Sequence, residues 1–317
     1  MPLARRSPPL ARLAPLCAGA LALGCSTAGS GGPRPSDSAS STSAAATAPP
    51  TATGVAASRA SHPIVIYGDT RTGDEVHRKV VAAIRRVEPA MVFHTGDLVV
   101  DGTKPELWIT FDAITGELRR EAPFYPVLGN HERGSPLYFE HFELPNNERW
   151  YAVDTPLARF LVLDNYSPLA AGSEQRSWLD AELARRSPKP VVVLEHQPFF
   201  STGHHGGSET LQRELLPVLE AGGVAAVFAG HDHDYERSLH HGVVHVVAGG
   251  GGAPLYQQDK RDPRSVKFVA AHHFCVLTAA ERGVHVEART PEGETLDSFD
   301  FGAGPTAPAS ASAPSAP

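Results

Sequence analysis

The chain has 317 residues and carries 35 acidic against 28 basic side chains, which gives a formal net charge of −7 at pH 7. This balance disfavours nucleic acid as the main partner, because proteins that bind the phosphate backbone present clustered Lys and Arg. Only three cysteines are present, so a fold held together by disulfides is not expected.

The first 25 residues have the pattern of an export signal. Arg5, Arg6 and Arg12 precede an apolar stretch at 13–23, which is too short to cross a bilayer as a helix. The tetrapeptide ALGC, which ends at Cys25, resembles a bacterial lipobox. We therefore predict an exported protein, either a cell-envelope lipoprotein anchored through Cys25 or a periplasmic protein.

Composition divides the remaining chain into three parts. Residues 26–61 and 303–317 consist mostly of Ala, Ser, Thr, Pro and Gly, and such segments bury too little apolar surface to offset the entropy cost of ordering the chain. They are predicted to be a disordered linker and a disordered tail. Residues 62–302 are long enough for one α/β domain with its own hydrophobic core.

Within this domain, five short apolar runs each lead into polar residues that can bind a metal ion. In chain order they are IVIYGD at Asp69, MVFHTGD at Asp97, FYPVLGN at Asn130, VVVLEH at His196, and AAVFAGHDH at His231 and His233. The runs predict β-strands, and the carboxyl ends of parallel strands meet at one edge of a sheet. We therefore expect the six donors to converge.

Helices and further strands are predicted between and after these runs. Apolar residues recur at helical spacing over 76–87, and again over 105–118, where Thr103 is placed to cap the start of the helix. Gln175 opens another helix. Four later apolar segments predict strands that could pair antiparallel in a second sheet, at 160–163, 243–248, 274–278 and 284–288.

The donors combine two carboxylates, one carboxamide oxygen and three imidazoles. Such a mixed oxygen and nitrogen set suits Zn, Mn or Fe(II), whereas calcium prefers oxygen alone. Six donors exceed the four of a tetrahedral zinc site. Two divalent metal ions that share one carboxylate fit the count better.

These donors belong to five motifs. The motifs are Gly68-Asp69, Gly96-Asp97 through Gly102, Gly129-Asn130-His131-Glu132, His196-Gln197-Pro198 and Gly230-His231-Asp232-His233. Their order resembles the calcineurin-like metallophosphoesterase superfamily, and the DYER sequence after the last motif is similar to its purple acid phosphatase branch. The resemblance implies an α/β fold in which two mixed β-sheets pack as a sandwich with flanking helices.

The resemblance also implies a role for each residue. Asp97 would bridge two metal ions, of which one would be completed by Asn130, His196 and His231 and the other held by Asp69 and His233. The nucleophile would be a hydroxide that the two metals generate from a shared water. His131 would be the general acid that protonates the leaving group, oriented by Glu132.

Two positions depart from the superfamily pattern. Its first motif reads Asp-x-His, but here Arg71 replaces the His, and a guanidinium has no lone pair for a metal. The purple branch supplies a Tyr three residues after the bridging Asp, where this chain has Val100. A ferric centre bound by tyrosinate is therefore not expected, and the ion beside Asp69 should bind more weakly than the other.

Two further residues are candidates for binding substrate. Arg71 could hold the phosphate, since its planar fork suits two oxygens, or it could cap the following helical region or pair with Asp74. His205, in the Gly-rich loop after His196, is predicted to contact the phosphate or the leaving group. It is a weaker candidate for metal ligand than His196, because no apolar run precedes it.

The sequence thus predicts metal-dependent hydrolysis of phosphate esters, with phosphomonoesterase as the leading activity. A phosphodiesterase or nucleotidase is one alternative. A catalytically impaired, metal-binding cell-envelope protein is the other, suggested by the missing ligands of one metal. The expected partner is a small phosphate ester, and contact with a membrane is expected only through the N-terminal lipid anchor.

Overall fold

The computed structural model describes residues 62–302 apart from Arg186. The predicted export signal, the lipid site at Cys25, the linker and the tail lie outside the described residues. Among the residues that are described, no helix is both long and apolar enough to cross a membrane. Cys275 is buried and its thiol is free.

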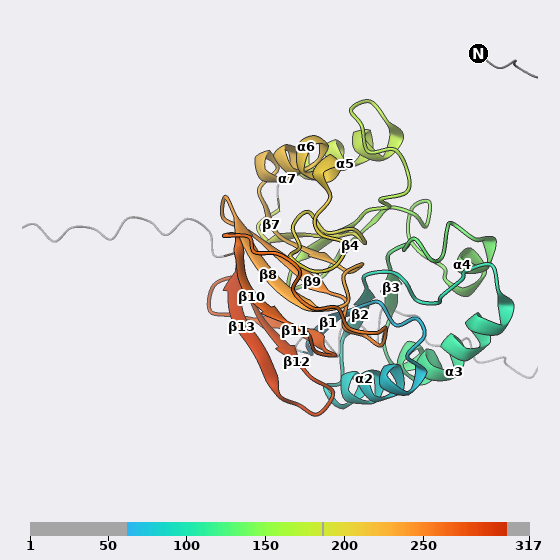
Figure 1. Cartoon of the computed structure of the whole chain (residues 1–317). Coiled ribbons are helices and arrows are strands. Elements are labelled where there is room, and N and C mark those ends of the chain that lie inside the picture. The colour runs from blue at the N-terminus through green and yellow to red at the C-terminus, as the bar shows by residue number, and fades with distance from the viewer. Residues whose placement is uncertain (1–61, 186, 303–317) are drawn as a thin grey trace, which may run out of the picture. The chain divides into compact units, whose positions relative to one another are not determined.

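The described residues form two mixed β-sheets with helices on their outer sides, which confirms the predicted fold class (Figure 1). The first sheet has the order β13-β12-β11-β1-β2-β3, that is Thr295–Phe301, Val284–Arg289, Phe274–Ala279, Ile64–Tyr67, Met91–His94 and Phe124–Pro126. The second has the order β10-β8-β9-β7-β6-β5-β4, that is Ser265–Val269, Tyr235–His240, Val243–Ala248, Val224–Ala229, Val191–Leu194, Arg159–Val162 and Tyr151–Asp154. The helices are α2 (Asp74–Arg86), α3 (Pro105–Glu121), α4 (Pro136–His141), α5 (Glu174–Ala184), α6 (Glu209–Glu214) and α7 (Leu216–Ala221).

The central strands of both sheets are parallel and buried. β1 pairs in parallel with β2, and β2 with β3, so the chain must cross back over the sheet after each strand. α2 and α3 make these crossings and pack against each other. Every residue of β1 and of β9 is buried. This is the pattern of strands that are covered on both faces.

Apolar side chains fill the space between the sheets and the layers under the helices. Phe93 on β2 and Phe160 on β5 meet across the two sheets, with ring centroids 4.5 Å apart. Ile84 of α2, Trp108 of α3 and Leu219 of α7 are fully buried on the outer sides. Each such side chain contributes roughly 1.5–3 kcal/mol by leaving water.

Two local predictions are wrong. Thr103 does not cap α3: its hydroxyl donates to Asp101 (2.7 Å), and the helix begins after Lys104 without a side-chain cap. Pro105 at the first helical position has no N–H to satisfy, so the need for a cap is reduced. The four later strands also do not share one sheet. β11 and β12 do pair antiparallel, but they extend the first sheet beside β1, whereas β5 and β9 lie in the second.

Candidate metal centre

The six predicted donors follow the carboxyl ends of parallel strands in both sheets. They are Asp69 after β1, Asp97 after β2, Asn130 after β3, His196 after β6, and His231 and His233 after β7. The backbone N–H of His231 donates to the carboxylate of Asp69 at 3.0 Å, which joins the two sheets at this edge. Residues that are far apart in the sequence therefore converge between the sheets.

Three of these donors lie in the left-handed backbone region. The φ angle is 57° at Asp69, 57° at Asp97 and 72° at His231. For a residue other than glycine this conformation costs about 1–2 kcal/mol, and it persists only where the surrounding structure imposes it. Such strain concentrates at functional sites.

The glycine that precedes Asp97 is required by both conformation and space. Gly96 has a φ of 98°, which side chains rarely adopt. A Cβ at this position would lie 2.6 Å from Nδ1 of His196 and 3.0 Å from the backbone nitrogen of Gly129. The GD motif after β2 therefore allows three donor loops to approach one another closely.

Four donors form a group in which nitrogen and oxygen atoms converge. Nε2 of His196 lies 3.0 Å from Oδ1 of Asn130 and 3.4 Å from Oδ1 of Asp97. Nδ1 of His231 lies 3.1 Å from the same oxygen of Asn130 and 3.3 Å from Nε2 of His196. Ligands held about 2.0–2.2 Å from one cation lie roughly 3–3.5 Å apart. We call these four residues the four-donor group, and its spacing is that of a metal site.

The hydrogen bonding of His196 also supports a metal site. Its Nδ1 lies 2.8 Å from the carbonyl oxygen of Thr95, which can only accept, so the neutral ring carries its proton there and a lone pair on Nε2. That lone pair points toward Oδ1 of Asn130, 3.0 Å away. A divalent cation satisfies both atoms, and the mixture of imidazole, carboxamide and carboxylate fits Zn, Mn or Fe(II).

The remaining donors are arranged differently, because Arg71 lies among them. Its Nε is 3.3 Å from Oδ2 of Asp97, and one terminal nitrogen is 3.2 Å from Nε2 of His233. Nδ1 of His233 lies 2.8 Å from the carbonyl oxygen of Pro254, so its Nε2 carries the lone pair that accepts from Arg71. Arg71 thus pairs with Asp97 rather than with Asp74.

Burial and charge set the protonation of the donors. Burial lowers the pKa of His231 to about 3 and that of His233 to about 4, so both rings are neutral at pH 7 and offer a lone pair. Burial, and then the charge of Asp97, raise the pKa of Asp69 well above its ordinary value. Burial acts in the same direction on Asp97, but neighbouring histidines and Arg71 outweigh it and lower the pKa of that carboxyl.

His131 lies beside Asp97 at the open side of the centre. Its backbone N–H donates to Oδ1 of Asp97 at 3.1 Å, and its Nε2 is 3.6 Å from Oδ2. Nδ1 lies 2.6 Å from the carbonyl oxygen of Val100, so this nitrogen is protonated and Nε2 is the atom that faces the centre. The side chain is 20% exposed, which leaves it accessible to a bound molecule.

Glu132 does not orient His131 as the sequence predicts; Val100 does so instead. The fully buried carboxylate accepts four backbone N–H groups, from Gly129 (2.7 Å), Leu98 (2.9 Å), Asp97 (3.1 Å) and Val99 (3.3 Å). Burial, and then the charge of Asp97, raise the pKa of Glu132 to about 8. Its contacts organise the loop after β2 that carries Asp97.

Three rings lie at the rim of the centre. His205, predicted to contact substrate, is exposed and stacks on His231 with centroids 4.3 Å apart. Tyr256 stacks on His233 at 4.2 Å, and the hydroxyl of Tyr166 is 3.5 Å from Oδ1 of Asn130. The two tyrosines are not predicted from the sequence.

Asn165 supports the centre but is not predicted from the sequence, although it follows a recognisable sequence pattern. The carboxamide oxygen of Asn165 accepts the N–H groups of His196 (2.8 Å) and Gln197 (2.7 Å) and so fixes the loop after β6. Asn165 and Tyr166 follow the apolar run FLVLD, the same pattern that marks the metal donors. Tyr256 follows no such run, and only the folded chain brings it to His233.

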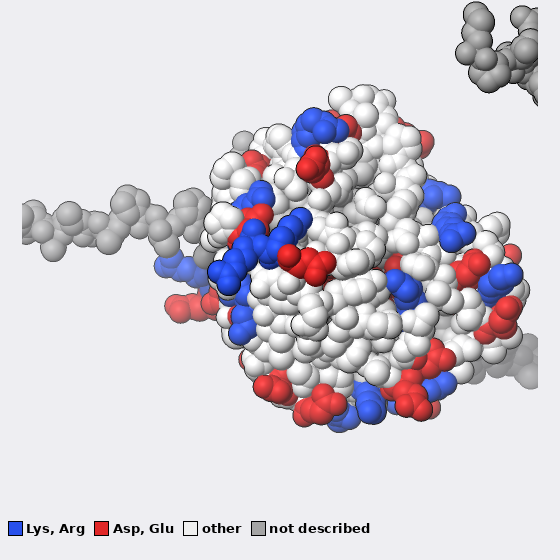
Figure 2. All heavy atoms as spheres, in the orientation of Figure 1, with Lys and Arg blue, Asp and Glu red and all other residues white. Residues whose placement is uncertain are grey.

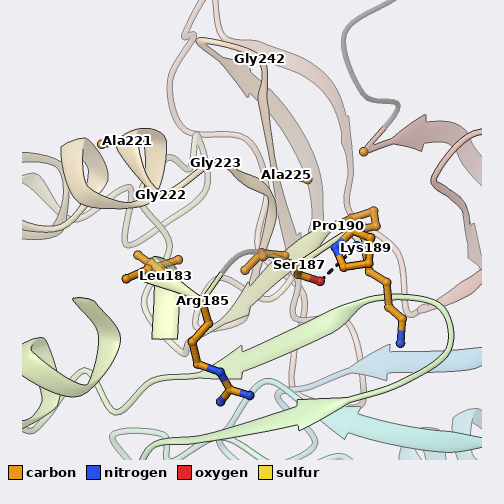
Figure 3. Close-up of a pocket in the computed structure, with 14 residues that line it drawn as sticks. Leu183, Arg185, Ser187, Lys189, Pro190, Ala221, Gly222, Gly223, Ala225 and Gly242 are labelled. Atoms are coloured by element: carbon orange, nitrogen blue, oxygen red, sulfur yellow. Dashed lines mark hydrogen bonds between the residues drawn. The ribbon is translucent and has the colours of Figure 1, made fainter. Parts of the chain in front are cut away.

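A large cavity lies elsewhere in the domain (Figure 3). Its volume is about 810 Å³, and its lining includes Gly222 and residues at the amino ends of β6 and β7, opposite the ends that carry the donors. The cations drawn there are engaged elsewhere, since Nζ of Lys189 donates to the carbonyl of Thr155 (2.6 Å) and Arg185 pairs with Glu182 (3.2 Å). Among the described residues that line this cavity, Lys189 and Arg185 are thus already paired.

Comparison with known protein families matches residues 62–235, more than half of the chain, to the family described as calcineurin-like phosphoesterase. The chain belongs to the calcineurin-like phosphoesterase family. The matched segment contains all six donors, from Asp69 to His233. The family depends on a centre of two metal ions.

Similar proteins within the family are purple acid phosphatases. "Purple acid phosphatase 21" of Arabidopsis thaliana is 32% identical over 162 residues, 45% of this chain and 37% of that protein. "Probable inactive purple acid phosphatase 1" of the same plant is 26% identical over 259 residues, 66% of this chain and 42% of that protein. A solved purple acid phosphatase from yellow lupin (Lupinus luteus) seeds has a TM-score of 0.68 at 22% identity, covering 75% of this chain and 53% of that structure. The chain spans less than half the length of these two curated relatives.

Proposed function

We propose that this member of the family is a metal-dependent phosphoesterase that hydrolyses small phosphate esters, with phosphomonoesters as the leading substrates. One observation carries the proposal: Nε2 of His196 lies 3.0 Å from Oδ1 of Asn130, 3.3 Å from Nδ1 of His231 and 3.4 Å from Oδ1 of Asp97. Nitrogen and oxygen atoms at this spacing can all contact one cation held between them. A resident divalent ion is the simplest partner for these atoms.

The chemistry divides between the metal and the chain. When bound, the metal lowers the pKa of water and stabilises charge on phosphoryl oxygens. The four-donor group fixes the position of that charge. His131 faces the same space through Nε2, and because Val100 holds the Nδ1 proton, the ring can give a proton from Nε2 to a leaving oxygen when it is doubly protonated.

The surroundings favour a small substrate. The rim rings of His205 and Tyr256 lie directly over metal-motif histidines, where they can contact the organic part of an ester. Figure 2 shows one face of the molecule on which basic and acidic side chains are interspersed and do not merge into a basic surface.

The proposal is tested by metal-reconstituted protein assayed on a chromogenic phosphomonoester and a chromogenic phosphodiester. We expect turnover of the monoester to exceed that of the diester and to vanish after chelation. Asp97→Asn should lose activity, whereas Asp180→Asn, an exposed carboxyl on α5, should keep it. A clear preference for the diester would favour the phosphodiesterase alternative, and metal-independent turnover would contradict the proposal.

A second candidate is a metal-binding protein of the cell envelope without turnover. It is favoured by Arg71, which stands where the superfamily has a ligand, and by a relative whose name marks it as inactive. The same assay separates the two candidates. Protein that binds metal stoichiometrically but turns over neither ester, nor any in a broad panel of phosphate esters, would support this second candidate.

We also infer export and lipid attachment at Cys25, from the arginines, the apolar stretch at 13–23 and the ALGC sequence. Mass spectrometry of the mature protein, purified from bacterial membranes, tests this inference. A chain that starts at Cys25 with the mass of a diacylglycerol is expected. An unmodified start at another residue would exclude the anchor.

A further inference from the structure

We infer that the guanidinium of Arg71 takes the place of one of the two metal ions of the family, so that this chain binds a single divalent ion beside a fixed organic cation. The inference rests on the function proposed above. It comes from a contrast between the two groups of donors. The four donors converge with no cationic side chain among them, whereas in the other group Arg71 contacts both Asp97 and His233.

The hydrogens of the second group come from Arg71 and from the backbone. Arg71 donates to Oδ2 of Asp97 at 3.3 Å and to Nε2 of His233 at 3.2 Å. Both oxygens of Asp69 accept the backbone N–H of His231, at 3.0 and 3.1 Å. Nε2 of His233, which has a single lone pair, is therefore fully used by Arg71, and the carboxylates of Asp69 and Asp97 each already hold a hydrogen-bond donor.

The two carboxylate oxygens of Asp97 face different groups. Its Oδ1 lies 3.4 Å from Nε2 of His196 and so faces the four-donor group. Its Oδ2 lies 3.3 Å from Nε of Arg71. The carboxylate thus bridges, but it bridges a metal position and a guanidinium instead of two metal positions.

Arg71 is held in this place by its surroundings. The backbone N–H groups of Thr70 and Arg71 both donate to the carbonyl of Asp97, at 3.0 and 3.3 Å. Tyr256 stacks on the ring of His233 at 4.2 Å and fixes the nitrogen that accepts from Arg71. Only 16% of the arginine side chain is exposed. An arginine that pointed to solvent would be more exposed and would lack the bonds to Asp97 and His233.

Charge repulsion between Arg71 and a second metal ion also favours a single ion. A second divalent ion among Asp69, Asp97 and His233 would lie against the guanidinium, and like charges at such distances repel. Arg71 would have to leave and give up its bonds to two buried partners. A single ion avoids both costs and keeps the bridging carboxylate satisfied.

The substitution also gives Arg71 a part in binding. A guanidinium has five N–H donors, and two are used by Asp97 and His233. The others can donate to a phosphoryl oxygen of a substrate held beside the metal. Arg71 would then supply both the second positive charge and directional contacts to the phosphate.

Metal stoichiometry tests the inference without relying on activity. Folded apo-protein is titrated with Mn(II), and bound metal is counted by elemental analysis while electron paramagnetic resonance distinguishes isolated from coupled Mn(II). We expect one isolated ion per chain for the wild type. Arg71→His restores a lone pair at the superfamily position, and we expect it to bind two coupled ions. Arg282→His, an exposed change between β11 and β12, should bind one.

The results separate failure of the single-ion inference from failure of the proposed function. Two ions in the wild type would overturn the inference but leave a metal-dependent phosphoesterase intact. One ion in both the wild type and Arg71→His would show that Arg71 does not limit the stoichiometry, and this would also overturn it. No bound ion in the wild type would remove the metal centre and the proposed function together.

Discussion

The backbone N–H of His231 donates to both carboxylate oxygens of Asp69, a residue 162 positions earlier in the chain. Asp69 follows β1 of the first sheet and His231 follows β7 of the second, so this contact closes the edge where the two sheets meet. The donors of the centre are therefore positioned by contacts between the sheets as well as by their own loops. Disturbing the close approach of these loops should disturb metal binding.

Gly96→Ala should weaken both folding and metal binding. The new Cβ would lie 2.6 Å from Nδ1 of His196 and displace the ring from its bond with Thr95. We expect a loss of roughly 1–3 kcal/mol in the free energy of unfolding, as for other strained core substitutions, together with weaker Mn(II) binding. Urea unfolding and Mn(II) titration measure the two effects.

The matched control for this change is Gly172→Ala. Gly172 also has a positive φ, of 84°, but an added Cβ would meet no atom within 4 Å. The Gly172→Ala variant therefore measures the cost of backbone strain without a steric clash. Equal losses of stability and metal affinity in the two variants would show that the clash with His196 has no effect.

His131→Gln should lower kcat with little change in bound metal. The variant removes the proton donor at Nε2 but none of the four-donor group, and general acid catalysis typically contributes roughly 10²–10⁴-fold. The loss should be larger for an alkyl phosphate than for a nitrophenyl phosphate, because nitrophenolate leaves without protonation. Equal losses on both substrates would argue against a proton-donating role.

Glu132→Ala should destabilise the protein by several kcal/mol. Four buried backbone N–H groups lose their acceptor, and leaving even one such group unsatisfied costs about 1–3 kcal/mol. Glu132→Gln keeps one acceptor oxygen and should lose less. Urea unfolding at neutral pH compares them, and equal stability of the Ala variant and the wild type would refute this role.

His245 on β9 should make stability depend on pH. It lies between Phe199 and Phe200, and neither ring nitrogen has a hydrogen-bond partner among the described residues. Burial, followed by the charges of His240 and Arg264, lowers the pKa of His245 to about 3. Because the unfolded chain binds this proton near pH 6.5, stability is retained above that pH and is lost as the pH falls toward 3.

The size of the effect follows from the shift. Between pH 8 and pH 5, His245 should reduce the free energy of unfolding by about 2 kcal/mol. His245→Leu removes this contribution, so the wild type should lose about 2 kcal/mol more than the variant over that interval. His204→Leu, at a side chain that is 61% exposed, is the control. Parallel pH profiles for the wild type and His245→Leu would contradict the assignment.

Much of the centre could be predicted because its donors follow a local rule. Each of Asp69, Asp97, Asn130 and His196 comes one or a few residues after an apolar run, and the edge of a parallel sheet brings such positions together. The two-sheet architecture itself came from the order of the motifs rather than from the strands. Periodicity did not show that β11 joins the first sheet, because local pattern identifies a strand but not its distant partner.

The roles of Arg71, Glu132 and Tyr256 could not be predicted in the same way. The sequence shows that Arg71 replaces a ligand, but only the folded chain shows that it contacts Asp97 and His233. Glu132 looks like a partner of its neighbour His131, yet its hydrogen bonds go to backbone groups of the loop after β2 and to Gly129 in its own loop. Contacts between loops depend on tertiary structure, and the sequence around each residue does not reveal them.

The most direct measurement is anomalous X-ray diffraction from a crystal of the protein grown or soaked with Mn(II). We expect an anomalous peak about 2.0–2.3 Å from the donor atoms of Asp97, Asn130, His196 and His231. A peak located elsewhere, or no peak at this position at saturating Mn(II), would contradict this expectation.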